Sequence, residues 1–343
     1  MKKKRRFFRS PPPVTLSDEW RAWIVENAVS GVSRDELVQT LEAANIPRRL
    51  AMREVEAILT SPAFVGCKRL RARTEQLELV LRLWRMQSAF ATSPNEIERR
   101  ETAAADEFFE HYYGAMRPVI FTNMLRDWPA LAKWSPEYFA ERFGNVEIEV
   151  VTGRDADPVG HRNIDKHRQT MTMADYCGFV RSRGVTNDIY LVSGNRAFER
   201  PELAELLDDL TPPADIFDVP VRPGYASLWF GPAGTRTPLH HDGSNILICQ
   251  IYGRKRITLV APTSAALAQH AEGFYAPEDW KNLVANEDNP AAIRTVELSA
   301  GEALFLPIGY WHDVEALEPS IHVSMLGFGK PNSVNWYRPG FVQ

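Results

Sequence analysis

Short segments rich in β-branched and aromatic residues, separated by glycine and proline, fill the chain from Ala226 to Phe328. Such segments are typical of β-strands, and the glycine and proline between them are typical of turns. Many short strands joined by tight turns predict a barrel of the jelly-roll type. We therefore expect a mainly β fold for this part of the chain.

Two histidines and an aspartate in this region form the first candidate site. His240 and Asp242 lie two residues apart in TPLHHDGSNILICQIYGRK, and side chains two apart in a strand share one face. His312 begins a new strand after the turn residues Pro307–Gly309. Two imidazoles and one carboxylate form the facial triad that binds non-haem Fe(II) and leaves coordination positions open. A His-X-Asp pair also occurs by chance, so the residues around it decide between the two interpretations.

These surroundings resemble the JmjC branch of the cupin-fold 2-oxoglutarate oxygenases, in particular the hydroxylase-like subgroup that includes the asparaginyl hydroxylase acting on hypoxia-inducible factor. The subgroup has threonine or serine three residues before His-X-Asp, then asparagine, glutamine, glycine and lysine, and later proline with Trp-His. The matching positions are Thr237, His240, Asp242, Asn245, Gln250, Gly253, Lys255, Pro307, Trp311 and His312. The resemblance spans roughly Phe108 to Phe328, about two thirds of the chain, and implies that the barrel is a double-stranded β-helix of the cupin type.

The resemblance implies a set of ligands and the residues that hold them. Fe(II) is expected as the metal, 2-oxoglutarate as the co-substrate and dioxygen as the oxidant. The metal ligands are then the catalytic residues His240, Asp242 and His312, and the residues that bind the co-substrate are Lys255, Thr237, Tyr190 and Asn245. For Lys255 the alternative is an exposed turn lysine between two arginines.

Three positions near the triad depart from the pattern or compete with it. Asn245 stands three residues after Asp242, where better-known members often have four, so its side chain can point differently. His241 fills the variable position and is expected to face away from the metal. His322, in SIHVSML, is the main rival of His312 as third ligand, or a residue that lines the site behind the ligands.

The N-terminal part of the chain predicts a different architecture. Residues 1–14 form a basic, proline-rich tail that we expect to be disordered, residues 15–95 an all-helical module, and residues 96–343 the barrel domain. Ser33 and Glu36 predict a capping box. The last helix of the module has an apolar stripe of Leu70, Leu77, Leu81 and Trp84. The module is either a packing cap on the barrel or an element for homodimerisation or peptide docking.

The segment from Arg154 to Thr170 is polar and predicts a long loop. It contains His161, Asp165 and His167, but no predicted strand brings them together. We therefore assign these three residues to a solvated or substrate-facing loop and not to a second metal site.

Composition excludes several classes of protein. The net charge of −4 and the pI near 6.1 argue against a general nucleic-acid-binding surface. No apolar run reaches the roughly 18 residues of a membrane span, so no membrane partner is expected. Three scattered cysteines are too few for a disulfide framework or a cysteine-rich zinc site. A cytoplasmic protein is expected, since ferrous iron also suits a reducing compartment.

The function implied by the resemblance is that of an Fe(II)/2-oxoglutarate-dependent dioxygenase, a hydroxylase of an unactivated C–H bond in a protein or peptide side chain. One alternative is a catalytically silent cupin-fold protein that binds a metal or a partner. N-methyl demethylation and oxidation of a small molecule or a modified nucleobase also stay open. The joint presence of the triad, Lys255 and Thr237 favours catalysis, because a scaffold has no physical need for that combination.

Overall fold

The computed structural model describes residues 15–88, 96–157, 159–287 and 292–332. The chain divides into two compact units, Met1–Leu83 and Trp84–Gln343. This division falls within the last helix of the predicted module, whereas the sequence placed the boundary at residue 95. The predicted disordered tail, residues 1–14, lies outside the described residues.

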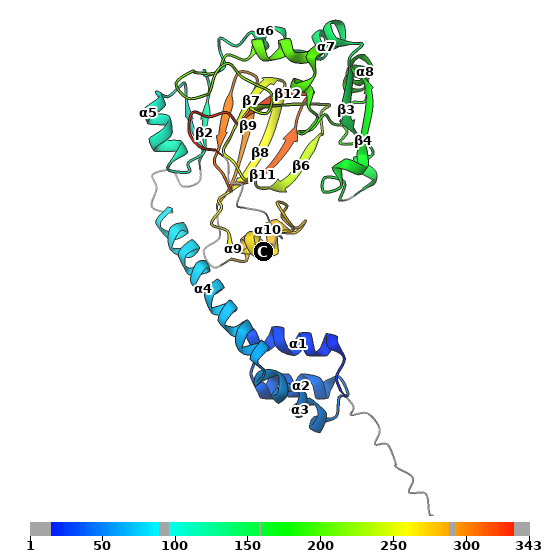
Figure 1. Cartoon of the computed structure of the whole chain (residues 1–343), viewed down its shortest axis with the longest axis vertical. Helices are drawn as coiled ribbons and strands as arrows, with labels where there is room; N and C mark the ends of the chain where they lie inside the picture. The colour runs from blue at the N-terminus through cyan, green and yellow to red at the C-terminus, as the bar shows by residue number, and fades with distance from the viewer. Residues whose placement is uncertain (1–14, 89–95, 158, 288–291, 333–343) are drawn as a thin grey trace, which may run out of the picture. The chain divides into compact units, whose positions relative to one another are not determined.

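The first unit is helical, as expected (Figure 1). Its helices are α1 Asp18–Val29, α2 Arg34–Ala43, α3 Arg48–Leu59 and α4 Pro62–Ser88, the last of which continues into the second unit. The predicted capping box at the start of α2 is present, because the Ser33 hydroxyl accepts from Glu36 N and the Glu36 carboxylate accepts from Ser33 N. Ile24, Leu37 and Val55 are buried in the small core of α1, α2 and α3.

Helix α4 carries exposed apolar side chains. Leu70 is 63% and Leu77 is 68% exposed, and Leu81 is half-buried. In contrast, the buried residues of α2 face the core of the unit. The apolar stripe predicted from the sequence is therefore exposed to solvent at Leu70 and Leu77.

The second unit is a two-sheet β structure, which confirms the predicted fold class. The strands of the first sheet, in spatial order, are β1 Glu98–Arg100, β2 Val119–Phe121, β10 Ala303–Leu306, β7 Ile246–Tyr252, β12 Ser320–Met325 and β5 Ala226–Gly231. Those of the second sheet are β6 Arg236–His240, β11 Trp311–Ala316, β8 Arg254–Val260 and β9 Ile293–Ser299. Apart from the parallel β1–β2 pair, all the pairs between these strands are antiparallel.

A one-residue connection takes the chain from the first sheet to the second. Gly253 lies between β7 and β8 with φ +71°, a left-handed conformation that favours glycine. A Cβ atom at Gly253 would lie 2.1 Å from the carbonyl oxygen of Pro319. Gln250 closes the turn, because its side-chain amide donates to the carbonyl oxygens of Tyr252 and Gly253.

Helices and a small hairpin cover the barrel (Figure 1). The helical elements of this unit are α5 Ala105–Phe108, η1 Phe109–Tyr113, α6 Pro129–Lys133, α7 Pro136–Phe143, η2 Arg154–Ala156, η3 Ile164–His167, α8 Met173–Ser182, η4 Ala197–Glu199, η5 Pro201–Asp209, α9 Ala265–His270 and α10 Trp280–Ala285. The hairpin pairs β3 Glu147–Val151 with β4 Arg168–Thr172. The predicted loop thus ends earlier than expected, because Arg168, Gln169 and Thr170 pair with β3.

Among the described residues, none of the helices combines the length and the apolar character that crossing a membrane requires.

Candidate metal centre and cavity

Cross-strand pairing brings the two predicted histidine ligands together. His240 ends β6, and His312 lies near the start of β11, directly opposite His240 in the antiparallel register. Directly opposite side chains project from the same face of a sheet and lie close together. The two imidazole rings accordingly lie with their centroids 4.0 Å apart.

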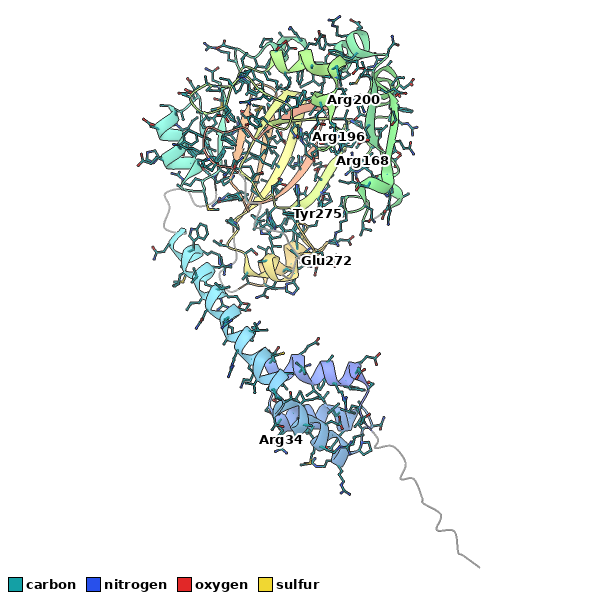
Figure 2. All side chains as sticks on the ribbon, viewed as in Figure 1. Arg34, Arg168, Arg196, Arg200, Glu272 and Tyr275 are labelled. Carbon is teal, nitrogen blue, oxygen red and sulfur yellow. The ribbon has the colours of Figure 1, made fainter. Side chains whose placement is uncertain are left out.

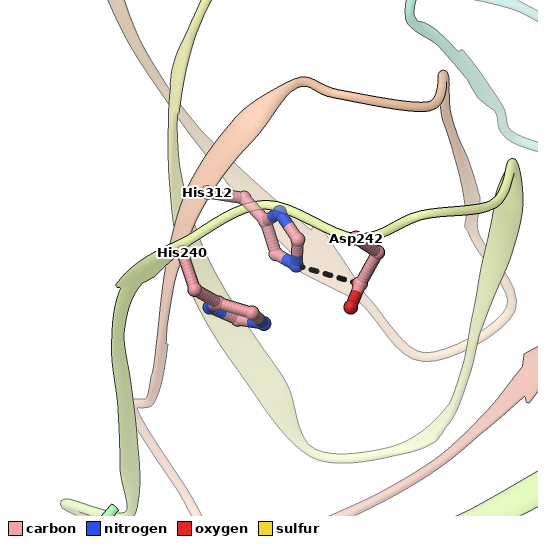
Figure 3. Close-up of side chains that lie close together, drawn as sticks. All are labelled: His240, Asp242 and His312. Atoms are coloured by element: carbon pink, nitrogen blue, oxygen red, sulfur yellow. Dashed lines mark ion pairs between the residues drawn. The ribbon is translucent and has the colours of Figure 1, made fainter. Parts of the chain in front are cut away.

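Asp242 completes the cluster from the segment after β6 (Figure 3). Its backbone carbonyl accepts from Gly309 N, which ties the segment to the turn before β11. Its Oδ2 lies 3.4 Å from Nε2 of His312. One ligand atom from each of His240, Asp242 and His312 can be chosen so that all three lie within 4.8 Å of one another.

Backbone carbonyls fix the tautomers of both histidines. Nδ1 of His240 lies 2.9 Å from the carbonyl oxygen of Pro238, and Nδ1 of His312 lies 3.0 Å from that of Tyr310. A carbonyl only accepts, so Nδ1 must carry the proton and Nε2 keeps its lone pair. Two neutral imidazole nitrogens and a carboxylate are the donor set that suits ferrous iron, and the residues present therefore fit this metal.

The cluster favours the ionisation states that metal binding needs. Burial and then the charge of His312 lower the pKa of His240 to about 4, so this imidazole is neutral at pH 7. Burial raises the pKa of Asp242, but the neighbouring His312 and the other nearby histidines outweigh it and bring that pKa to about 2. Metal binding at neutral pH therefore releases no proton from either residue.

A partly open cavity of about 170 Å³ adjoins the cluster. Ten of its nineteen lining residues are Val, Ile, Tyr, Trp or Phe, and the other nine have polar or charged side chains. The lining residues are Val151, Arg154, His161, Ile164, Tyr190, Val192, Ser193, Trp229, Thr237, His240, Asp242, Ile246, Ile248, Phe274, Tyr275, His312, Val314, His322 and Ser324.

A β-bulge explains how Thr237 and His240 both line the cavity although they are three residues apart. Simple alternation along a strand would place them on opposite faces. The pairing runs from His312 opposite His240 to Val314 opposite Thr237, so β6 has one more residue than β11 in this interval. Because of the extra residue, the side chains of Thr237 and His240 lie on the same face of the strand.

Lys255 and Tyr190 meet at another part of the cavity wall. Lys255 is 1% exposed, and its Nζ donates to the Tyr190 hydroxyl at 2.9 Å. The expected alternative, an exposed turn lysine, is thereby excluded. Tyr190 lines the cavity, and Lys255 lies behind Tyr190. Burial lowers the pKa of Lys255 to about 7.

Asn245 is not brought together with the other predicted co-substrate residues. It does not line the cavity, its side-chain oxygen accepts from Ile308 N, and its amide donates to Asn332. Asn245 lies three residues after Asp242, where better-known family members often have four. Its side chain is directed to Ile308 and Asn332 and not to the cavity. Asn245 thus holds the turn before β11 and the segment after β12.

The other two histidines noted in the sequence occupy different places. His241 packs its ring against Trp311, with centroids 4.6 Å apart, and does not line the cavity. His322 lines the cavity and stacks on Trp229, but it is not part of the three-residue cluster. Among the described residues its Nδ1 has no hydrogen-bond partner.

The sequence predicts His161 in a solvated or substrate-facing loop, but it does not single out Arg154 or Tyr275 as residues of the site. Arg154 and His161 line the cavity from the segment after β3. Tyr275, which is labelled in Figure 2, lines it from the segment between α9 and α10. The Tyr275 hydroxyl donates to the carbonyl oxygen of His161 at 3.2 Å, which joins the two segments. The polarity of the loop and its assignment as substrate-facing could have indicated Arg154, whereas Tyr275 lies in a different segment, between α9 and α10.

Comparison with known proteins gives matches over the same region. The model of a family described as cupin-like domain matches residues 105–326. Jumonji C domain-containing protein 5 of Drosophila melanogaster is 28% identical over 249 residues, which are 68% of this chain and 60% of the relative. Lysine-specific demethylase 8 of Xenopus tropicalis is 27% identical over 244 residues, 68% of this chain and 53% of the relative.

A human relative is matched over more of its own length. Bifunctional peptidase and (3S)-lysyl hydroxylase JMJD7 of Homo sapiens is 25% identical over 251 residues, which are 63% of this chain and 79% of the relative. The chain spans less than two thirds of the length of the first two relatives.

Proposed function

Since the chain belongs to the cupin-like JmjC family, whose members are oxygenases that use Fe(II), 2-oxoglutarate and dioxygen, we propose that it hydroxylates an unactivated C–H bond in a protein or peptide side chain. The observation that carries the proposal is the cluster of His240, Asp242 and His312 beside the cavity, with both Nε2 atoms left as lone-pair donors. A relative whose name includes lysyl hydroxylase supports a side-chain substrate.

The metal cluster and the Tyr190 region of the cavity have separate parts in the reaction. His240, Asp242 and His312 would hold iron, and the carbonyl partners of the two Nδ1 atoms keep both imidazoles turned toward it. Tyr190 and Lys255 supply a hydroxyl and a cation for the distal carboxylate of 2-oxoglutarate, and Thr237 supplies a further hydroxyl from the cavity wall.

The proposed reaction converts 2-oxoglutarate, dioxygen and R–H to succinate, carbon dioxide and R–OH. Bound iron would supply the activation of dioxygen. The chain itself binds and orients the reactants, while the aromatic rings of Phe274 and Tyr275 in the cavity wall limit access of water. Asn245 has no direct part in this proposal, because its side chain is engaged with Ile308 and Asn332.

Turnover of 2-oxoglutarate to succinate tests the proposal. The purified chain, supplied in air with 2-oxoglutarate, Fe(II) and ascorbate, should release succinate, and Asp242→Ala should not. Asp215→Asn, which changes an exposed carboxylate outside the cavity, is the matched control and should behave as the wild type. Metal binding without turnover, in the presence of candidate peptides, would support a catalytically silent metal- or partner-binding protein instead.

Mass spectrometry can then separate hydroxylation from demethylation and from oxidation of a non-protein substrate. Products heavier by one oxygen atom in proteins captured from cell extract support side-chain hydroxylation. Loss of a methyl group supports demethylation, and an oxidised small molecule or nucleobase supports a substrate that is not a protein. A cytoplasmic location is part of the proposal, because ferrous iron needs a reducing compartment.

We also propose that the N-terminal helices mediate homodimerisation. The supporting observation is the exposure of Leu70 and Leu77 on α4, since exposed apolar patches on a helix commonly mark contact surfaces. Sedimentation should show a dimer for the full chain and a monomer for residues 93–343. Changing both Leu70 and Leu77 to glutamate should give a monomer, whereas Thr74→Glu, an exposed polar position on the same helix, should not. A dimeric truncated chain would place the contact on the barrel.

A further inference from the structure

Arg154 is a buried cation that faces the cavity. Its side chain is 8% exposed and belongs to the lining, in contrast to Lys255, which lies behind Tyr190. It begins the short helical turn η2, so the segment that follows β3 positions it and not a barrel strand.

The contacts of Arg154 leave its charge without a counterion. Nη2 donates to the carbonyl oxygen of Arg236 at 2.7 Å, and the guanidinium carbon lies 5.3 Å from the centre of the Tyr190 ring. Nη1 is buried and has no hydrogen-bond partner among the described residues. Within the same set of residues no carboxylate forms an ion pair with Arg154, whereas Arg236 binds both carboxylate oxygens of Asp313.

A buried guanidinium without a counterion is unfavourable, and it cannot escape by losing its proton. Burial lowers the pKa of Arg154, but from an ordinary value so high that the group stays charged at neutral pH. A buried donor without an acceptor adds to the cost. An anion that enters the cavity would relieve both, and the planar fork of a guanidinium matches a carboxylate best.

We infer that Arg154 is a carboxylate-binding residue of the cavity, in addition to Lys255. The inference deepens the proposed function and rests on it for the identity of the ligand. Two molecules could bring the carboxylate. If Lys255 takes the distal group of 2-oxoglutarate, Arg154 is left for an acidic group of the substrate; if Lys255 stays behind Tyr190, Arg154 takes the co-substrate.

Two calorimetric titrations under oxygen-free conditions separate these sources. The first titrates 2-oxoglutarate into the full chain loaded with Mn²⁺. The second titrates N-acetyl amino acids, as free acids and as the corresponding amides, with and without saturating Mn²⁺ and 2-oxoglutarate. The variants are Arg154→Gln, which removes the charge, and Arg154→Lys, which keeps it. Arg162→Gln is the control from the same loop, because Arg162 pairs with the exposed Glu272 and does not line the cavity.

We expect Arg154→Gln to weaken the binding of one of the two carboxylate ligands, 2-oxoglutarate or the N-acetyl amino acids, by about tenfold or more, as for the loss of a charge-assisted hydrogen bond. Arg154→Lys should recover part of this loss. Weaker 2-oxoglutarate binding assigns the residue to the co-substrate. Loss of a preference for acids over amides, with 2-oxoglutarate binding unchanged, assigns it to the substrate.

The inference is overturned if Arg154→Gln, shown by its melting curve to be folded, changes the affinity for neither 2-oxoglutarate nor the N-acetyl amino acids by more than about twofold. It is also overturned if the wild type binds acids and amides equally and Arg154→Gln leaves 2-oxoglutarate binding unchanged. A wild-type chain that binds neither Mn²⁺ nor 2-oxoglutarate rejects the proposed function, whereas a charge-dependent preference for acids would still support Arg154.

Discussion

The metal cluster and the Lys255 region of the cavity differ in how the charged group of each is stabilised. At the metal cluster, Asp242 lies beside His312, and the neighbouring groups together keep its carboxylate ionised. At the other region the ammonium of Lys255 is buried with a hydroxyl as its hydrogen-bond partner and, among the described residues, without a carboxylate. The Asp242 carboxylate is stabilised before a metal binds. The buried ammonium of Lys255, in contrast, is unfavourable until an anion binds beside it.

The largest expected effect is at the metal cluster. Asp242→Ala removes the only anionic ligand of the predicted triad, so the affinity for Mn²⁺ or Fe(II) should fall by more than about a hundredfold, since even the loss of residues behind the ligands costs up to that much. The metal-free variant should melt close to the wild type, because Asp242 follows β6 and is not part of an apolar core. Anaerobic metal titration and thermal melting check both outcomes. Normal metal affinity would remove Asp242 from the ligand set.

Lys255→Met should act in the opposite direction on stability. It removes a buried charge while nearly keeping the volume, so the metal-free protein should gain at least about 1 kcal/mol, or roughly 2–4 °C in melting temperature. The affinity for 2-oxoglutarate should fall about ten- to a hundredfold, because a charge-assisted hydrogen bond is lost. Arg256→Met, at the neighbouring half-exposed position on β8, is the control. Unchanged 2-oxoglutarate affinity in Lys255→Met would show that another cation binds the distal carboxylate.

The same contrast predicts a pH dependence. Lys255 has a pKa near 7 when folded and an ordinary value near 10.5, so between these values the unfolded chain binds one more proton and this residue's contribution to stability rises with pH. Conversely, 2-oxoglutarate needs the protonated form, and its affinity should fall about tenfold per pH unit above 7. His240 and Asp242 do not titrate in this range.

Calorimetry in two buffers of different ionisation enthalpy measures this proton uptake directly. Binding of 2-oxoglutarate at pH 8.5 should take up about one proton in the wild type and none in Lys255→Met. Equal proton uptake by the two proteins would assign the titration to another group.

The smallest effect is expected for Tyr190→Phe. It removes the hydroxyl that accepts from Lys255 but keeps the aromatic wall of the cavity, so the 2-oxoglutarate affinity should fall about threefold to tenfold. Metal affinity should stay that of the wild type. A loss as large as that of Lys255→Met would mean that the hydroxyl, and not the ammonium, provides most of the binding.

The sequence predicted the architecture better than the details of the cavity. Strand periodicity and turn residues identified the barrel, and the capping residues of α2 marked that helix, because these signals are local. The proximity of Thr237 and His240 followed from the family resemblance alone, since alternation predicts opposite faces and a bulge is invisible in the residue pattern.

Non-local contacts explain what was missed. Arg154 enters the cavity because its loop reaches Arg236, and no periodic signal reports such a contact. Asn245 matched the resemblance by residue type, yet its side chain is held by Ile308 and Asn332, far along the chain. Residue identity and approximate spacing therefore predicted where the strands lie, but not the direction of each side chain.

The turn at Gly253 limits how this protein can change in evolution. A single residue joins the strand of Gln250 to the strand of Lys255, and it is too crowded by Pro319 for a side chain. An insertion there that shifts β8 by one position would turn Lys255 outward and a neighbouring arginine inward, because successive side chains alternate. The length of this loop is therefore as constrained as the identity of any residue in the cavity, and related chains that keep the lysine should tolerate neither insertions nor deletions at this point.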